Sequence, residues 1–245
     1  MESLALTRTL NTLFAGPVDS LLNLVGIHPA NPAAPIDNTF ALELLIVAGL
    51  IVYFIVVRAT LSVEKPSALQ HVAEMIHEFI QGQGDSIIGH SHSRFQAFTT
   101  CIFMFVLICN LSGLIPGIPA PTMTATVPLG LAICTFIYYN FHGIRVHGPI
   151  GYLKEFAGPI WWISWLLFPI ELISHCARIM SLTIRLWANM FAGDLVTLVF
   201  FSLIPAVIPV AFMALHLMVS VIQALVFTLL TMIYLSGAVA GEHEH

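Results

Sequence analysis

The chain has 245 residues, of which 58% are hydrophobic and only 9% are charged, with a formal net charge of -5. Soluble domains carry about 25% charged residues. This chain instead contains several apolar runs of about 20 residues, the length that crosses a bilayer. We therefore expect an all-α integral membrane protein surrounded by membrane lipid, with no separate soluble domain. The small, unclustered charge excludes nucleic acid as a partner.

The first part of the chain is mixed in polarity and contains several prolines. We interpret residues 1–39 as an N-terminal tail near the outer membrane surface. The tail does not have the pattern of a cleavable secretory signal or of an organelle presequence. After Pro66, apolar residues recur at helical spacing between Gln, Glu and His residues, which predicts an interfacial amphipathic helix over about 66–88.

Residues 40–245 are expected to form a single membrane domain with five membrane-crossing helices. The last two are long, because between Pro169 and Pro205 there is no proline and a single glycine, Gly193. An uninterrupted helix there is about 53 Å long, against about 30 Å of hydrocarbon, so we expect strong tilting rather than two short spans that meet at Gly193. The predicted spans are about 40–61, 95–115, 124–143, 160–203 and 209–240.

Lysine and arginine indicate the orientation, because they concentrate in cytoplasmic loops. They follow the first and third predicted spans, whereas the opposite side carries only Arg8. The N-terminus is therefore expected outside and the C-terminus in the cytoplasm. The residues that decide this are Arg58, Lys65, Arg94, Arg145 and Lys154.

A polar stripe follows the predicted helix over 160–203. At about 100° per residue, its members fall within an arc of about 80°, and Asp194 lies about 140° from them. The stripe consists of Glu171, His175, Arg178, Arg185 and Asn189.

The predicted helix over 209–240 carries a second stripe. His216, Ser220, Gln223 and Tyr234 share one face among Leu, Val, Ile and Phe. Two polar stripes in lipid are expected to face each other or a watery cavity.

Arg185 is the most unusual residue, since an arginine at bilayer depth costs about 2.5 kcal/mol or more unless it is compensated. Its neighbours one helical turn away include Ser181 and Asn189, and none is acidic. One alternative is a structural salt bridge to another span. The other is that its carboxylate partner belongs to another protein.

The remaining polar residues sort by depth. Glu171 and His175 lie toward the predicted inner surface, and Asp194 and His216 toward the outer one, with Arg185 between them. This order is typical of two offset aqueous half-paths separated by a fixed positive charge. The alternative for each histidine is a hydrogen bond between helices.

No cofactor, metal or nucleotide site is expected. The histidine pairs His90/His92 and His142/His147 have no third ligand at metal spacing and are interpreted as solvated polar loops. The single cysteines, which have no C-x-x-C spacing, are interpreted as core packing residues: Cys101, Cys109, Cys134 and Cys176.

Three segments together resemble a known family. They are "RLWANMFAGD", "NLSGLIPG" and "HLMVSVIQALVFTLLTMIYLSGA". The first is similar to Arg-Leu-Phe-Gly-Asn-Met-x-Ala-Gly-Glu, the hallmark of subunit a of rotary F-type ATP synthase, and the second to that family's Asn-Leu-x-Gly-Leu-x-Pro turn. The resemblance extends from about residue 40 to the end.

The resemblance implies a role for each matching residue. Arg185 matches the essential stator arginine, and Asn189 and Gln223 match the polar residues beside it. Asp194 and His216 match the acid and the histidine of the outer half-channel, and Glu171 matches an acid on the inner side. Three residues depart from the family pattern: this chain has Trp187 where the family has Phe, Ala188 where it has Gly, and Asp194 where it has Glu.

The resemblance also implies partners: a ring of c subunits whose carboxylates meet Arg185, peripheral stalk b subunits and the rest of the F1F0 complex. The expected location is a bacterial inner membrane, with an organelle inner membrane as the alternative. A self-contained secondary transporter of an anionic substrate remains the rival function, although no internal repeat supports it. A purely structural scaffold would leave the buried arginines unused.

Overall fold

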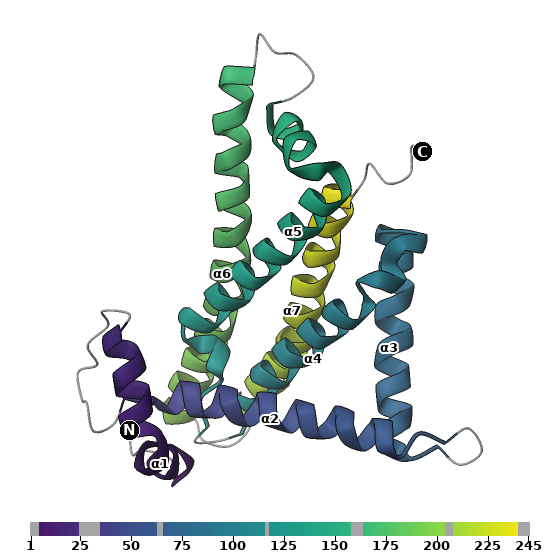
Figure 1. The fold of residues 1–245 in the computed structure, drawn as a ribbon. Coiled ribbons are helices and arrows are strands. Elements are labelled where there is room, and N and C mark those ends of the chain that lie inside the picture. The colour runs from purple at the N-terminus through teal and green to yellow at the C-terminus, as the bar shows by residue number, and fades with distance from the viewer. Residues whose placement is uncertain are drawn as a thin grey trace. The chain divides into compact units, whose positions relative to one another are not determined.

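The computed structural model describes residues 5–24, 35–62, 66–115, 118–157, 164–203 and 208–239. All regular secondary structure in these residues is helical, which confirms the predicted all-α fold class (Figure 1). The chain divides into two compact units, residues 1–59 and residues 60–245. Lys65 and part of the N-terminal tail lie outside the described residues.

The first unit contains α1 (Ala5–Leu24) and α2 (Asn38–Ala59). Thr7 Oγ1 donates to Asn38 Oδ1 over 2.7 Å. The side chain of Asn11 both donates to the Ile36 carbonyl and accepts from the Ile36 amide, each over 3.0 Å. Helix α2 is the first predicted span. Helix α1 was not predicted, although Leu10, Leu13 and Phe14 have the spacing of one helix face.

The predicted amphipathic helix is α3 (Ala68–Ile87). It begins after Pro66 because the Ser67 hydroxyl accepts from the Gln70 amide over 3.3 Å and so caps the first turn. Ile80 is buried against the second unit's core, whereas Val72 and Met75 are exposed. The amphipathic pattern is therefore confirmed, while its place at the membrane interface stays a prediction.

Helix α4 (Gln96–Ser112) and helix α5 (Thr126–Ala157) follow. Short 3-10 turns precede them at His90–Arg94 and Pro121–Met123. Helix α5 extends well past the predicted end at residue 143. It bends at Gly148, whose φ of +71° favours glycine. The helix thus continues beyond the predicted membrane span, whose end at about residue 143 stays a prediction.

Helices α6 (Ser164–Leu203) and α7 (Ile208–Val239) have 40 and 32 residues. Helix α6 continues through Gly193, so the prediction of one long helix is confirmed. Four helices among the described residues are long and apolar enough to cross a membrane, and α4 is a shorter apolar helix. Five crossings and strong tilting stay predictions.

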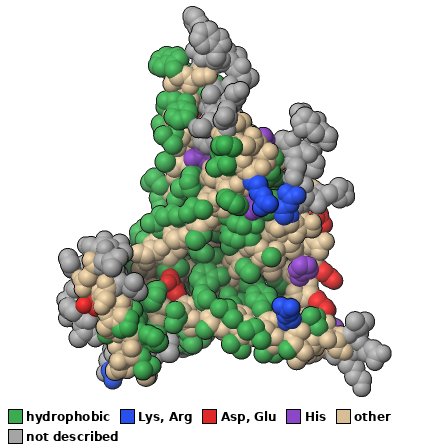
Figure 2. All heavy atoms as spheres, in the orientation of Figure 1, with side chains coloured by type: hydrophobic (Ala, Val, Ile, Leu, Met, Phe, Trp, Pro, Cys, Tyr) green, Lys and Arg blue, Asp and Glu red, His purple; other side chains and the backbone are tan. Residues whose placement is uncertain are grey.

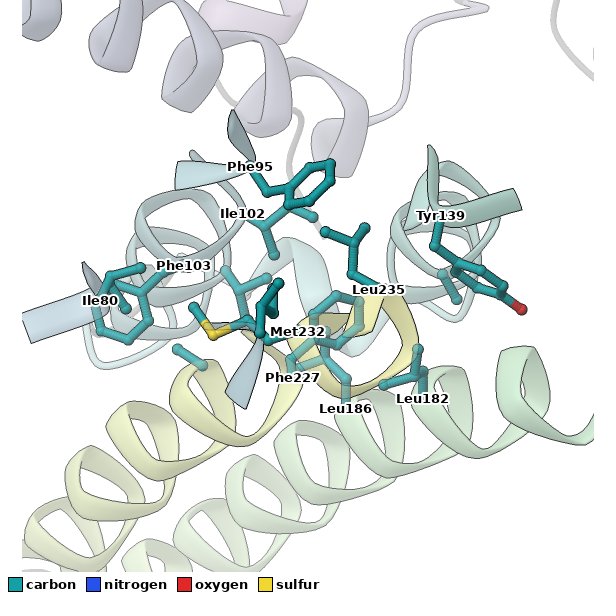
Figure 3. Packing of buried hydrophobic residues seen from close by; sticks show 14 of the residues in the cluster. Ile80, Phe95, Ile102, Phe103, Tyr139, Leu182, Leu186, Phe227, Met232 and Leu235 are labelled. Atoms are coloured by element: carbon teal, nitrogen blue, oxygen red, sulfur yellow. The ribbon is translucent and has the colours of Figure 1, made fainter. Parts of the chain in front are cut away.

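The core of the second unit lies where α3 to α7 meet, and Figure 3 shows the converging side chains of Phe95, Phe103, Phe227 and Leu235. Many large hydrophobic side chains also lie on the outside, and hydrophobic side chains cover long stretches of the face in Figure 2. Such a surface suits lipid or a membrane-embedded partner.

The interpretation of all four cysteines as core residues was wrong. Only Cys109 is buried, whereas the other three are exposed on the chain: Cys101, Cys134 and Cys176. Lipid tails are as apolar as leucine, so a small apolar residue in a membrane helix has no preference for the protein interior.

The interpretation of His92 as a solvated loop residue was also wrong, because its side chain is fully buried. The imidazole fills the space beside Gly84, where a β-carbon would collide with the ring. The two histidines of the other pair, His142 and His147, are partly exposed within α5.

Candidate functional site

The polar stripes of α6 and α7 face each other, as predicted. Asn189 Nδ2 donates to Gln223 Oε1 over 2.9 Å. One residue further along α6, Met190 Sδ lies 3.9 Å from the Ser220 hydroxyl. From Asn189 to Met190 the contacting residue on α7 changes from Gln223 to Ser220, so the two helices run antiparallel. The stripes meet at Asn189–Gln223 and again where Arg178 lies over the Tyr234 ring, and the two stripes together are called the polar seam below.

Arg185 lies on α6, one turn before Asn189, and is partly exposed. Its Nη2 donates to the Ser181 hydroxyl over 3.3 Å. Among the described residues, the ion pairs involve Asp85 and Glu171, and neither includes Arg185. The described part of the chain therefore supplies a hydroxyl but no carboxylate to this guanidinium.

Two predicted residues, Glu171 and His175, meet in a pocket of about 120 Å³ at the end of the seam nearer the start of α6. Glu171 Oε1 lies 3.5 Å from His175 Nε2 and 3.6 Å from Arg178 Nη2. His175 is 5% exposed, whereas the Glu171 side chain is 39% exposed. The pocket thus has a buried end at the imidazole and an open end at the carboxylate.

Three tyrosines complete this pocket: Tyr139 and Tyr152 from α5 and Tyr234 from α7. The Tyr139 hydroxyl lies 2.7 Å from His175 Nδ1. The guanidinium carbon of Arg178 lies 5.3 Å from the centre of the Tyr234 ring, a cation–π contact. Sequence reasoning missed Tyr139 and Tyr152. For Tyr139, the sequence did offer a signal: the polar run Tyr138–Asn140 interrupts an otherwise apolar helix.

A second pocket, of about 370 Å³, lies toward the other end of the seam. Asn189 and Gly193 line it from α6, and Phe212 and His216 from α7. His216 is 7% exposed, and its Nε2 has no hydrogen-bond partner among the described residues. A buried, unpaired ring nitrogen beside a pocket of this size is suited to binding water.

Comparison with known proteins identifies the class of protein. The family model described as "ATP synthase A chain" matches residues 21–236. The chain belongs to the ATP synthase A chain family. An ATP synthase subunit a of Koribacter versatilis is 50% identical over 238 residues, which cover 97% of each chain. One of Solibacter usitatus is 46% identical, covering 95% of this chain and 99% of that protein.

More distant members of the ATP synthase A chain family match as well. The subunit a of Sulfurimonas denitrificans is 36% identical over 212 residues, 85% of this chain. Membership in the family disfavours the rival interpretation of a self-contained anion transporter.

In this member of the ATP synthase A chain family, the predicted site residues Ser181, Arg185 and Gln223 line neither pocket, and neither does Asp194. It is partly exposed on α6, but it is not among the residues that line the His216 pocket. Gly193, its neighbour, faces that pocket instead. The geometry therefore brings His216, Asn189 and Gln223 together and leaves Asp194 on another face of α6.

In the described part of the chain, no three His, Cys, Asp or Glu side chains lie close enough together to hold a metal ion. The polar groups of the two pockets are instead titratable side chains, hydroxyls and amides. The titratable side chains can exchange protons with water, and the hydroxyls and amides can hydrogen-bond to that water.

Proposed function

We propose that this chain is the stator subunit of an F-type ATP synthase. It forms two offset half-channels that carry protons to and from carboxylates on a rotating ring of c subunits. Proton flow then drives ring rotation and ATP synthesis on other subunits, because this chain has no nucleotide site of its own. Family membership supports this function.

One observation carries the site assignment: Arg185 lies on the polar seam without a carboxylate from the described residues. At 1.5 Å per residue, it lies about 15 Å from His175 and about 12 Å from Gly193 along α6. The guanidinium therefore separates the two pockets. Facing the ring, it would attract each deprotonated carboxylate and block direct passage of protons between the half-channels.

The inner half-path consists of Glu171 and His175, with Ser181 beside Arg185. The outer half-path passes His216, and Asp194 contributes a carboxylate nearer the outer surface. The Asn189–Gln223 hydrogen bond keeps α6 and α7 together where the two paths approach Arg185. An elementary charge that crosses 100 mV releases about 2.3 kcal/mol, so several protons are needed for each ATP.

The partners are the c-ring, the peripheral stalk b subunits and the rest of the F1F0 complex. The bacterial sources of its relatives support a bacterial inner membrane. The N-terminus lies outside and the C-terminus in the cytoplasm. Five helices cross the membrane, and the tilt of α6 and α7 lets them follow the curved outside of the ring.

The decisive experiment replaces Arg185 by Ala in the assembled complex and measures ATP-driven proton pumping in inverted membrane vesicles. We expect pumping to be lost while the chain remains in the complex. The matched control is Arg145→Ala, which removes an exposed arginine on α5. Normal pumping by the Arg185 variant would refute the proposed function of this residue.

A further inference from the structure

Tyr139 and His175 form an enclosed polar pair in the second unit. Tyr139 is 2% exposed and His175 is 5% exposed. Their rings stack at 5.8 Å with an interplanar angle of 19°, and Phe136 meets the imidazole edge to face at 5.9 Å. Figure 3 shows Tyr139 at the edge of the hydrophobic cluster with its hydroxyl directed outward. The imidazole is thus held in one orientation.

The hydrogen bond between the two side chains has a preferred direction. A carboxylate oxygen accepts a hydrogen bond, and Glu171 Oε1 lies 3.5 Å from His175 Nε2, which places the ring proton on Nε2. His175 Nδ1 then accepts from the Tyr139 O–H over 2.7 Å. A neutral imidazole that accepts at Nδ1 carries its proton on Nε2.

His175 Nε2 is the ring nitrogen on the side of Glu171, 3.5 Å from Oε1. Arg178 approaches the same oxygen at 3.6 Å. The other titratable groups around the pair are Tyr152 on α5, which donates to Asn140 Oδ1 over 2.8 Å, and Tyr234 on α7. The Glu171 carboxylate therefore faces two donors.

We propose that Tyr139 is a positioning residue of the inner half-path, which acts by orienting His175 so that Nε2–H faces the Glu171 carboxylate. The inference rests on the proposed function and adds a residue from α5 to it. A proton that reaches Glu171 forms an O–H bond there. Transfer of that proton to water in the pocket breaks the bond and restores the carboxylate, so no other reactant is needed.

The size of the pocket is consistent with this role. A water molecule requires about 10–15 Å³ of such space, and the pocket offers about 120 Å³. Several water molecules can therefore contact Glu171 while Tyr139 and His175 close the buried end. Without the phenol, His175 Nδ1 would lose its partner and the ring could turn away from the carboxylate.

The test is Tyr139→Phe, which removes the hydroxyl and keeps the ring. The measurement is passive proton flux through vesicles that contain the F0 sector, recorded as a function of pH. We expect the flux to fall by about 3- to 10-fold, the effect of one lost hydrogen bond. The shape of the pH profile should also change, because the Glu171 carboxylate then faces one donor fewer.

The matched control is Tyr138→Phe. Tyr138 is the adjacent residue, its ring stacks on Phe98 at 3.6 Å, and it does not line the pocket. We expect flux and pH profile to match the unmodified complex. An unchanged flux and profile in Tyr139→Phe would overturn the proposal.

A double-mutant cycle with His175→Ala tests whether Tyr139 acts through His175. We expect Tyr139→Phe to cause no further loss in the His175→Ala background, and additive losses would overturn the proposal. If Tyr139→Phe does not assemble, His175→Asn replaces it, since Asn can accept from the phenol but offers no Nε2–H. Flux should again fall, and unchanged flux would overturn the proposal. These outcomes are independent of the pumping assay on Arg185, which tests the proposed function itself.

Discussion

Gly193 on α6 and His216 on α7 are in direct contact, and the contact requires a glycine. A β-carbon at position 193 would lie 2.7 Å from His216 Nδ1 and 3.1 Å from Cε1. The atoms that this β-carbon would meet belong to the His216 ring itself, so the ring would have to shift from its observed position. The only glycine in the central part of α6 thus makes room for a predicted proton-path residue.

We therefore expect Gly193→Ala to impair proton flow. The methyl group displaces the imidazole from the 370 Å³ pocket, and a displacement of about 1 Å at a reacting group can cost up to about 100-fold in rate. A loss of about 10-fold in passive proton flux through F0-containing vesicles is the expected result.

The control for that prediction is Gly130→Ala on α5, where a β-carbon would meet nothing within 4 Å. Alanine stabilises an exposed helical position by about 1 kcal/mol relative to glycine. The control should assemble and conduct normally. Equal flux in both variants would show that His216 does not need its observed position.

His216 and Asp194 should differ in importance, because only His216 lines the outer pocket. We expect His216→Ala to reduce ATP-driven pumping severely and Asp194→Asn to reduce it only a few-fold. Both variants are compared at equal content of assembled complex. An unchanged rate in Asp194→Asn would remove that carboxylate from the path, and a larger effect than that of His216→Ala would contradict the assignment from the pocket.

Asn110 should be important for stability. It is fully buried, donates to the Ser220 carbonyl over 3.2 Å and accepts from the Thr122 hydroxyl over 2.8 Å. Asn110→Leu leaves the buried Thr122 hydroxyl without its acceptor and removes the hydrogen bond to Ser220 on α7. We therefore expect the free energy of unfolding to fall by about 1 kcal/mol. Thermal unfolding of the complex in detergent measures it.

Two further variants test the origin of that effect. Thr122→Val, which removes one hydrogen bond at nearly constant shape, should cost less than Asn110→Leu. Ser112→Ala is the control, because the Ser112 hydroxyl donates only within α4, to Cys109. If Ser112→Ala destabilised the complex as much as Asn110→Leu, the hydrogen bond between Asn110 on α4 and Ser220 on α7 would not be important for stability.

His92 should make stability depend on pH. Burial lowers the pKa of His92, His77 lowers it further and Asp85 opposes the shift. The ring Nδ1 has no hydrogen-bond partner among the described residues, and Asp85 Oδ1 lies 3.9 Å away. The folded state therefore favours the neutral imidazole. As the pH falls below about 6.5, the unfolded chain binds a proton that the folded chain does not, so stability decreases.

The measurement is the unfolding temperature of the complex between pH 7.5 and 5 for the unmodified chain and for His92→Gln. The variant should lose less stability over this range. His71→Gln, at an exposed position on α3, should behave like the unmodified chain. Identical pH dependence in all three would show that His92 does not bind the proton on unfolding.

The sequence by itself was sufficient for the features that repeat along one helix. The apolar runs, the start of α3 after Pro66, the continuity of α6 through Gly193 and the polar stripe with Arg185 all follow from local periodicity and propensity. The resemblance of "RLWANMFAGD" to a family hallmark was equally local, and the family comparison confirms it.

Only the tertiary structure decided which side chains meet. The contacts of Tyr139 with His175, of Gly193 with His216 and of Gly84 with His92 each join different helices or a helix and a turn. These contacts form only when one helix has the right register and rotation against another. The sequence around either residue does not determine that arrangement. In lipid, an apolar residue is also as stable outside as inside, so hydrophobicity could not say which cysteines are buried.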